Sequence, residues 1–251
     1  MIDILITTYN RIDFLKRTVE SFIAKNRELP FRLFIIDDCS TDGTQEYLFS
    51  LQKQRQLDLY LNSERRGLAF SLDMIWNCVE MFDSFFEENS YLCYLQDDMR
   101  SVGEEWLLKV ISIYEDLRRN HLTDSSPIGF FSGYHSPEHP VENTLSYDGK
   151  EVYIKASNSG KNIIGEKRFW GSIGYIPRFN PNGSPRGMPG NGIGSQVDVY
   201  LEGMYSGSRI DAFAAAPNCL YRQGKKVLVI PGMLEHMGEE QDRSTWRGDE
   251  K

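Results

Sequence analysis

Two adjacent carboxylates end a hydrophobic run of this sequence. Residues 91–96 read YLCYLQ, and Asp97 and Asp98 follow at once. Open α/β sheets bind ligands at the carboxyl ends of their strands, and hard divalent cations take carboxylate oxygens. The pair therefore suggests a metal ion that holds a phosphate. An Asp-Asp pair after a strand is also typical of a turn or a helix N-cap, so the surrounding segments matter.

Three further polar segments follow apolar runs in the same manner. They are TTYNR at residues 7–11, DDCSTDGT at residues 37–44 and NSERRGLA at residues 62–69. Backbone amides, a hydroxyl and Arg11 in the first could meet a base or a phosphate, and carboxylates of the second could bind a base edge or a ribose. Arg65 and Arg66 could pair with diphosphate oxygens, because guanidinium matches that geometry. Taken singly, each segment also suits a helix cap, an Asx turn or a solvated pair.

Strands and helices must alternate to position these segments. The hydrophobic pattern predicts strands at residues 1–8, 31–36, 57–61 and 91–96, and helices around residues 14–22, 46–54, 67–82 and 104–119. Such alternation indicates βαβ units and a mainly parallel central sheet flanked by helices. The four polar segments then converge on the carboxyl edge of that sheet.

The second half of the chain has a different composition. Residues 125–191 are rich in Gly, Pro, Ser and Asn, and long loops of this kind usually carry function. The elements predicted there are short strands at 128–131, 152–154, 171–176 and 227–230 and a helix at 196–207. We expect one α/β domain with a smaller mixed sheet in this half, and a polar tail at 239–251. Trp170 suits either stacking on a sugar face or packing in the core.

Composition restricts the class of protein and its compartment. The 251 residues are 40% hydrophobic and carry a net charge of -8, which suits a globular domain and argues against charge-driven binding to nucleic acid. No segment approaches the roughly 20 apolar residues of a membrane span, and none resembles a signal peptide. The four cysteines lack metal-binding spacing, so we expect free thiols. We expect a cytoplasmic protein without a transmembrane segment, and peripheral attachment to a membrane through a partner stays open.

The ordered set TTYNR, IIDDCSTDGT, NSERRGLA and YLQDDM resembles the family 2 glycosyltransferases, which have the GT-A fold of nucleotide-diphospho-sugar transferases. The resemblance covers residues 1–120, which it implies are the nucleotide-sugar-binding half, and leaves residues 121–238 as the acceptor-binding half. It implies metal-dependent transfer of a sugar from a nucleotide diphosphate sugar to a hydroxyl of a glycan or glycolipid. A UDP-sugar is the first candidate for the donor. Inversion at the sugar and a place in polysaccharide biosynthesis are further expectations.

The resemblance also assigns residues of the first half to the donor. Thr7 and Tyr9 would line the base pocket, next to Arg11 of the same segment. Asp38 would recognise the base, with uracil as the first candidate. Arg65 or Arg66 would approach the phosphates.

For the metal, the resemblance implies Mn²⁺ or Mg²⁺ at the acidic pair. Asp97 would face the ribose or bridge to the ion, and Asp98 would ligate it. Gln96 departs from the acidic residue often found just before, so ligation would rest on Asp98. His236 is the histidine of a His-x-Gly sequence that follows the strand predicted at 227–230, and it resembles the late histidine that completes this site; imidazole favours manganese. A surface histidine is the alternative.

The catalytic base is expected at the start of the late helix, where inverting members of the family carry an acidic residue. A base is needed there to deprotonate the acceptor hydroxyl. Gln196 departs from that pattern, so Asp198 is the first candidate and Glu202, one helical turn further, is the second. Both residues also suit an exposed helix surface.

Two other functions compete with this one. A sugar-1-phosphate nucleotidyltransferase shares the layered fold but typically has a Gly-rich loop with Arg and Lys after the first strand, and TTYNR is not such a loop. A catalytically impaired glycan-binding protein of the same fold stays open because of Gln196.

Overall fold

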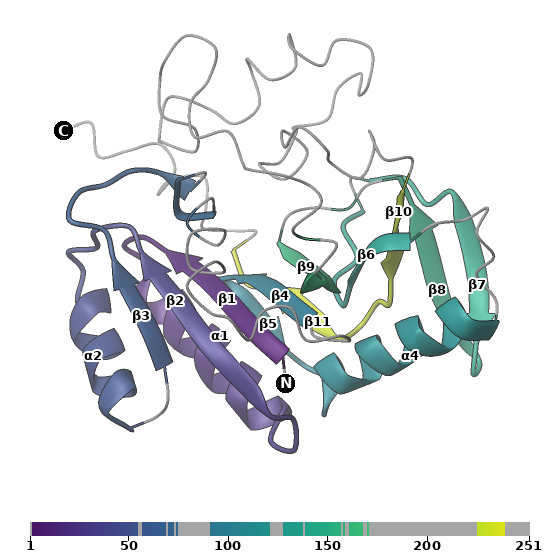
Figure 1. Cartoon of the computed structure of the whole chain (residues 1–251), viewed down its shortest axis with the longest axis horizontal. Helices are drawn as coiled ribbons and strands as arrows, with labels where there is room; N and C mark the ends of the chain where they lie inside the picture. Colours follow the sequence, from purple (N-terminus) through teal and green to yellow (C-terminus); the bar gives the residue numbers. More distant parts are fainter. Residues whose placement is uncertain are drawn as a thin grey trace, which may run out of the picture.

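The computed structural model describes residues 2–54, 57–68, 70–72, 74, 91–120, 128–137, 139–156, 158, 161–167, 170 and 225–238. Its first half contains β1 (Ile2–Thr8), α1 (Ile12–Lys25), β2 (Phe31–Asp37), α2 (Thr44–Gln54), β3 (Leu57–Leu61), β4 (Tyr91–Gln96), β5 (Met99–Ser101) and α4 (Trp106–Asn120). The second half adds β6 (Ile128–Ser132), β7 (Asn143–Tyr147), β8 (Lys150–Lys155), β9 (Asn162–Glu166), β10 (Lys226–Val229) and β11 (Leu234–His236). Figure 1 shows these elements around a central sheet.

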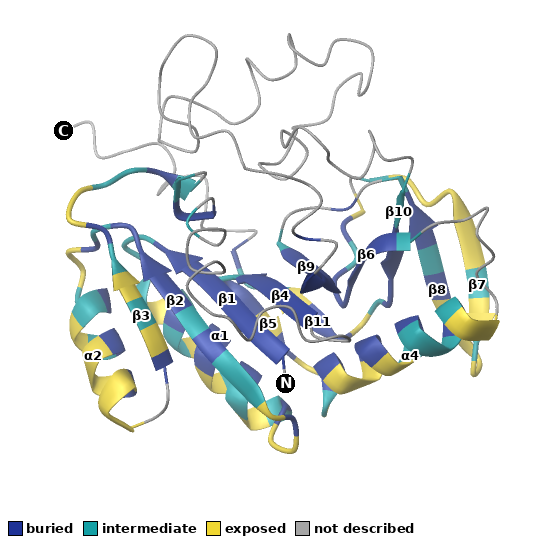
Figure 2. Cartoon of the chain, in the orientation of Figure 1, coloured by how far each residue is buried: buried dark blue, intermediate teal, exposed yellow. Residues whose placement is uncertain are grey.

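The first four strands of the main sheet are parallel and end at one edge. β1 lies between β2 and β4, and β3 pairs with the outer side of β2. The register places Thr8 opposite Asp37 and Thr7 opposite Gln96, so the polar segments that follow these strands start side by side. Every residue of β1 is buried, as expected for a central parallel strand covered on both faces (Figure 2). The predicted convergence of the polar segments is confirmed.

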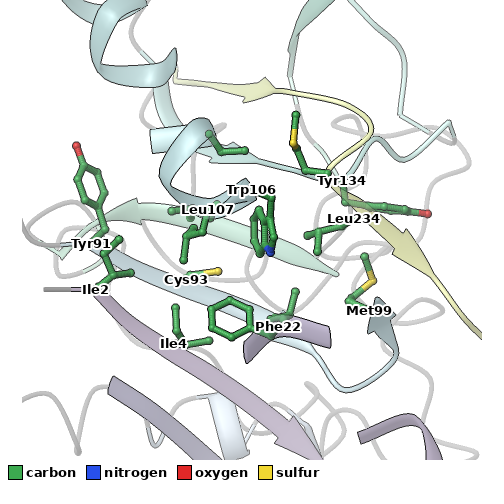
Figure 3. Packing of buried hydrophobic residues seen from close by; sticks show 14 of the residues in the cluster. Ile2, Ile4, Phe22, Tyr91, Cys93, Met99, Trp106, Leu107, Tyr134 and Leu234 are labelled. Carbon is green, nitrogen blue, oxygen red and sulfur yellow. The ribbon is translucent and has the colours of Figure 1, made fainter. Parts of the chain in front are cut away.

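Helices α1, α2 and α4 cover one face of this sheet. Alternate residues of β1 point to them, because side chains of a strand alternate between its faces. In α1 the apolar positions recur at helical spacing, and the ring of Phe22 meets Trp106 of α4 edge to face at 6.1 Å. Figure 3 shows Phe22, Trp106 and Cys93 packed together in this layer. The packing of these helices on one face of the sheet therefore fixes the strands whose carboxyl ends form the edge.

The opposite face has a smaller core that includes Trp170. This side chain is fully buried, its indole nitrogen donates to the carbonyl of Leu92 at 3.1 Å, and its ring packs on Phe130 at 4.6 Å. Of the two interpretations that the sequence allowed, the structure supports the core residue. Leu72 joins it from the start of the helix predicted at 67–82, of which the structure describes the helical residues 68, 70–72 and 74.

The strands of the second half extend the same sheet, whose order is β3-β2-β1-β4-β9-β6-β10-β8-β7. β9 runs antiparallel between β4 and β6, and of the five described pairings beyond β4 four are antiparallel, whereas β6 and β10 are parallel. A separate two-stranded sheet joins β5 to β11 directly after the acidic pair. The predicted α/β class with a central sheet, flanking helices and a small second sheet is thereby confirmed. The small sheet does not lie in the second half alone, because it pairs β5 with β11, and the strands of the second half join the central sheet instead. Of the described helices, none is both long and apolar enough to cross a bilayer.

Of the described strands, four were not predicted from the sequence: β5, β7, β9 and β11. β5 and β11 have three residues each, too few to show a period, and β9 lies in the Gly- and Ser-rich region. The strand predicted at 171–176 and the helix predicted at 196–207 lie outside the described residues.

Candidate active site

Asp97 is held from several sides by the first strand and the first helix. Its Oδ2 accepts a hydrogen bond from the hydroxyl of Thr8 at 2.7 Å, and its Oδ1 accepts one from Arg11 at 3.1 Å. The hydroxyl of Thr18 in α1 donates to the Asp97 carbonyl at 2.7 Å. Position and orientation of this carboxylate are therefore fixed by β1 and α1.

Asp98 is one of two buried carboxylates at this edge, with Asp37, that each have one oxygen without a hydrogen-bond partner among the described residues. Its Oδ2 accepts from Arg11 at 2.8 Å and faces Nε2 of His236 at 3.0 Å. Its Oδ1 is buried without a hydrogen-bond partner. Burial, the largest influence, raises the pKa of Asp98, but the hydrogen bond with His236 and the charge of Arg11 together outweigh it, so the pKa lies below its ordinary value. Asp98 is thus an ionised carboxylate with one oxygen left for a cation.

His236 reaches Asp98 from 138 residues away in the sequence because β11 pairs with β5. His236 lies opposite Met99, the residue after Asp98. Its other ring nitrogen, Nδ1, lies 3.3 Å from Nζ of Lys161, and that ammonium lies 3.5 Å from the hydroxyl of Tyr134. The structure thus brings together the two predicted metal ligands, and it adds a lysine that the sequence did not single out.

Asp98 and His236 fit a divalent metal ion. His236 Nε2 lies 3.0 Å from Oδ2 of Asp98, which is a hydrogen-bond distance and also the separation of two adjacent ligand atoms that each lie about 2.1 Å from an octahedral ion. Leaving Asp98 Oδ1 without a partner costs about 1–3 kcal/mol, a penalty that a bound cation would remove. In the part of the chain that the structure describes, no three His, Cys, Asp or Glu side chains form a complete metal site. Mg²⁺-type ions commonly take one or two protein ligands and complete their shell with phosphates and water.

Asp38 has a different environment. Its Oδ1 accepts from the side chain of Asn62 and the backbone of Arg66, both at 2.8 Å, and its Oδ2 accepts from the backbone of Gly67 at 2.8 Å. Gly67 has φ +89°, a conformation that glycine adopts readily, and this turns its N–H toward the carboxylate. Asp38 therefore organises the NSERRGLA segment, and base recognition by this residue stays a prediction.

Asn10 connects the first two polar segments. Its backbone N–H donates to the hydroxyl of Ser40 at 2.8 Å, and its side-chain oxygen accepts from the backbone of Thr41 at 2.7 Å. Asn10 and Cys39 both have positive φ, at +49° and +67°. Non-glycine residues in this region of backbone space are uncommon and cluster at functional sites. The TTYNR and DDCSTDGT segments thus form one rigid unit.

The residues predicted for the base pocket divide between the interior and the rim. Thr7 is buried and exchanges a hydrogen bond with the hydroxyl of Tyr94 at 3.0 Å. Tyr9 is half-buried, and the guanidinium of Arg65 stacks on its ring at 3.9 Å. This cation–π contact joins the ends of β1 and β3 and leaves the Tyr9–Arg65 pair at the rim of the edge.

Arg66 has different partners from Arg65. Its guanidinium pairs with Glu64 at 3.1 Å and lies over the ring of Phe70 at 4.6 Å. The predicted bases Asp198 and Glu202 lie outside the described residues, so their roles stay predictions.

Comparison with known proteins adds the family. Residues 3–140, more than half of the chain, match the model of glycosyl transferase family 2. No curated protein was found to match this chain in sequence. Similar solved structures include S. aureus TarS, with 16% identity and a TM-score of 0.48 over 70% of this chain and 30% of that one. They also include TarS 1-349 with UDP-GlcNAc, with 14% identity and a TM-score of 0.48 over 70% of this chain and 48% of that one.

A third similar structure is the mannosyltransferase PcManGT from Pyrobaculum calidifontis in complex with GDP-Man and Mn²⁺. It has 15% identity and a TM-score of 0.48 over 70% of this chain and 47% of that one. This chain thus corresponds to less than half of the length of these three structures. The family match starts within β1 and contains all four polar segments of the edge. The chain belongs to glycosyl transferase family 2 and has the GT-A fold that its polar segments predicted.

Proposed function

We propose that this protein transfers a sugar from a nucleotide diphosphate sugar to a hydroxyl of a glycan or glycolipid, with a divalent metal ion at Asp98 and His236. The observation that carries the proposal is the buried, unsatisfied Oδ1 of Asp98 beside an imidazole, at the edge where the family's polar segments meet. UDP-sugars are the first donors to test, and Mn²⁺ is the first ion because of the histidine.

The residues at the carboxyl edge have two roles in this proposal. Some bind the nucleotide sugar, and others compensate negative charge. Asp98 and His236 would hold the ion, which when bound supplies positive charge for the departing nucleotide diphosphate. Arg11, the N-cap residue of α1, forms ion pairs with both Asp97 and Asp98 and compensates their negative charge. The Tyr9–Arg65 pair provides an aromatic face and a guanidinium at the rim, suited to a base and a phosphate.

The two halves of the chain have different roles in this proposal. Residues 1–120 bind the donor, residues 121–238 bind the acceptor, and residues 239–251 form a tail. Asp198, with Glu202 as the second candidate, removes the proton from the acceptor hydroxyl, and the sugar is transferred with inversion.

Calorimetry with UDP, with and without Mn²⁺, tests the donor site directly. We expect Mn²⁺ to strengthen UDP binding by about tenfold or more, because the ion joins the carboxylate to the phosphates. The same affinity in Mn²⁺ and in a chelator would contradict the proposal. Hydrolysis of a panel that includes UDP-GlcNAc and GDP-Man, the donors seen with TarS and PcManGT, then identifies the sugar.

Substitution of the proposed base separates a transferase from a binding protein. We expect Asp198→Asn to retain UDP binding and to lose transfer by about 100-fold, a typical contribution of a general base. Asp58→Asn, on the exposed side of β3, is the matched control. If Asp198→Asn and Glu202→Gln both retain full transfer, the assignment of the base is wrong.

A further inference from the structure

Lys155, at the end of β8, is a buried cation that contacts three uncharged groups. Its side chain is fully buried. The ammonium donates to the carbonyl of Ser136 at 2.6 Å and to Oδ1 of Asn158 at 3.4 Å, and it lies 3.2 Å from Nδ1 of His135. Burial and the charge of Lys155 lower the pKa of His135, so this ring is uncharged at neutral pH. These four residues form the Lys155 cluster.

The other buried lysine of the described residues shows what Lys155 lacks. Lys167 forms an ion pair with the buried carboxylate of Asp3 at 2.7 Å. Within the described ranges, by contrast, no carboxylate forms an ion pair with Lys155. Burial of a charge without a counter-charge is unfavourable, and it lowers the pKa of Lys155 to about 8, which leaves the ammonium charged at neutral pH. An anion that reached Lys155 would remove this penalty.

A second unsatisfied donor belongs to the same cluster. Ser136 is buried, and its Oγ has no hydrogen-bond partner among the described residues. Asn158 holds the cluster together, because its Oδ1 accepts from the backbone of Ser136 at 3.2 Å and its Nδ2 donates to the carbonyl of Tyr134 at 2.8 Å. Lys155 and Ser136 thus contribute an ammonium and an unpaired hydroxyl, two donors that carboxylate and phosphate oxygens accept.

The Lys155 cluster lies in the proposed acceptor half, close to the proposed metal ligands. Tyr134, which precedes the cluster in the chain, has its ring 6.4 Å from the ring of His236. The rings of His135 and Tyr153 lie 5.0 Å apart, and both side chains are half-buried, so they form the rim of the cluster. Aromatic rings suit the apolar face of a sugar. Glu151, an exposed residue, contacts this rim through the hydroxyl of Tyr153 at 3.0 Å.

We propose that Lys155 and Ser136 form an anion-binding site that takes the carboxylate or phosphate of an acidic sugar in the acceptor. The contact with Asn158 is the longest of the three that the ammonium makes, so an anion oxygen can replace it. Asn158 keeps its bonds to Ser136 and Tyr134 when this happens. The hydroxyl of Ser136 donates to a second oxygen of the anion, and the rings of the rim pack on the sugar. The inference rests on the proposed function only for the statement that the bound sugar is the acceptor.

Titrations of the natural chain with glucuronate, glucose 6-phosphate and glucose test the site, in a chelator and without nucleotide. Carbon chemical shifts of the lysine side chains report binding. We expect at least one of the two anionic sugars to bind about tenfold or more tightly than glucose, because hydrogen bonds to charged groups are the stronger ones. The sugar that binds more tightly identifies the group as carboxylate or phosphate. If neither anionic sugar binds more tightly than glucose, the proposal is wrong.

The pKa of Lys155 gives a second readout on the natural chain. A bound anion favours the charged ammonium, so saturation with the anionic sugar should raise the pKa of Lys155 above its value of about 8. By linkage, the affinity for that sugar should fall as the pH rises through this value, because the free protein then loses the proton that the complex retains. A pKa that does not move at saturation would show that the anion binds elsewhere, and would overturn the proposal.

Substitutions in the cluster separate its two donors. Lys155→Met removes the charge and keeps an apolar stem in the buried position, so we expect binding of the anionic sugar to weaken by about tenfold or more. Ser136→Ala removes one hydroxyl and should weaken it by about threefold. Binding of the anionic sugar that is unchanged in Lys155→Met would overturn the proposal. Urea unfolding shows whether Lys155→Met folds, and if it does not, the pKa of Lys155 in the natural chain decides.

Lys53→Met, an exposed charge removal in the last turn of α2, is the control for an overall change in charge. We expect it to bind the anionic sugar like the natural chain, and a loss as large as that of Lys155→Met would overturn the proposal. These titrations need neither metal nor nucleotide. A chain that binds the anionic sugar but no UDP would contradict the proposed function alone, and a chain that binds UDP but neither anionic sugar would contradict this inference alone.

Discussion

Asp38 and Asp98 are buried carboxylates that follow β2 and β4, the two strands on either side of β1, yet their environments are opposite. Asp38 accepts three hydrogen bonds from uncharged donors, and both of its oxygens are used. Asp98 has two charged or polar partners on one oxygen and none on the other. A complete set of donors stabilises a loop, whereas an incomplete set on an ionised group leaves room for a ligand. The comparison therefore separates two kinds of residue at the carboxyl edge. Residues such as Asp38 hold its loops together and form the frame of the edge, and residues such as Asp98 can bind a ligand and form its reactive part.

The largest effect is expected when the incomplete carboxylate is removed. Asp98→Asn lowers the negative charge available to a cation, so metal-dependent transfer should fall by about 100- to 1,000-fold, in the range of a lost electrostatic contribution to catalysis. The free energy of unfolding should also fall, but by less than the about 3 kcal/mol of a fully broken buried ion pair, because Arg11 keeps its ion pair with Asp97 when the one with Asp98 is lost. Steady-state rates at saturating Mn²⁺ give the first quantity, and urea unfolding gives the second. Asp58→Asn is again the control, and a variant that retains its metal-dependent rate would contradict the contrast with Asp38.

Removal of Arg11 is expected to have the next largest effect. In Arg11→Met both carboxylates of the pair lose a charged donor at 2.8–3.1 Å, and loss of one partner of a buried ion pair costs about 3 kcal/mol of the free energy of unfolding. Mn²⁺ supplies a replacement charge, so it should stabilise the variant more than it stabilises the natural chain. Urea unfolding with and without Mn²⁺ measures both effects. Arg17→Met, exposed on α1, is the control, and an equal loss with and without Mn²⁺ would show that the ion does not replace Arg11.

Substitution of Asp38, whose two carboxylate oxygens both have donors, should lower the stability of the protein. In Asp38→Asn one oxygen becomes an amide donor that faces a backbone N–H, so the free energy of unfolding should fall by about 2 kcal/mol. Binding of Mn²⁺ in the absence of nucleotide should stay unchanged, because the Asp38 carboxylate is hydrogen-bonded to Asn62, Arg66 and Gly67 and the proposed metal ligands are Asp98 and His236. Urea unfolding and Mn²⁺ titration check the two statements, with Asp58→Asn as the matched control. A change in metal affinity larger than the change in stability would place Asp38 in the reactive part.

The frame of the site could be read from the sequence because it depends on parallel strands. Apolar runs that alternate with helices bring the ends of β1, β2, β3 and β4 to one edge, and the polar residues after each strand then have to meet. The helices that support the edge show the 3.6-residue period, so they too were predicted. Sequence periodicity was sufficient where the element was long and its neighbours were local.

The reactive part depends on contacts that leave no local pattern. Lys161 is a single lysine in a Gly- and Ser-rich segment, and its position follows from the antiparallel pairing of β9 with β4. His236 reaches Asp98 through two strands of three residues each. Only resemblance to a family singled out that histidine, and nothing in the sequence singled out Lys161. The role of Trp170 was likewise open until its burial against Phe130 and Leu92 was known.

The smallest expected effect compares two neighbouring hydroxyls of β1. Thr8 donates to the ionised carboxylate of Asp97 at 2.7 Å, whereas Thr7 exchanges a hydrogen bond with the neutral hydroxyl of Tyr94 at 3.0 Å. Hydrogen bonds to charged groups contribute about 1.5–3 kcal/mol and neutral ones about 1 kcal/mol, so Thr8→Val should destabilise the protein more than Thr7→Val. Each substitution keeps the shape of the side chain, and each serves as the control for the other in urea unfolding. An equal loss of unfolding free energy in both variants would mean that the hydrogen bond from Thr8 to Asp97 contributes no more than a neutral one. Arg11 and Thr18 would then be the residues that hold Asp97 in place.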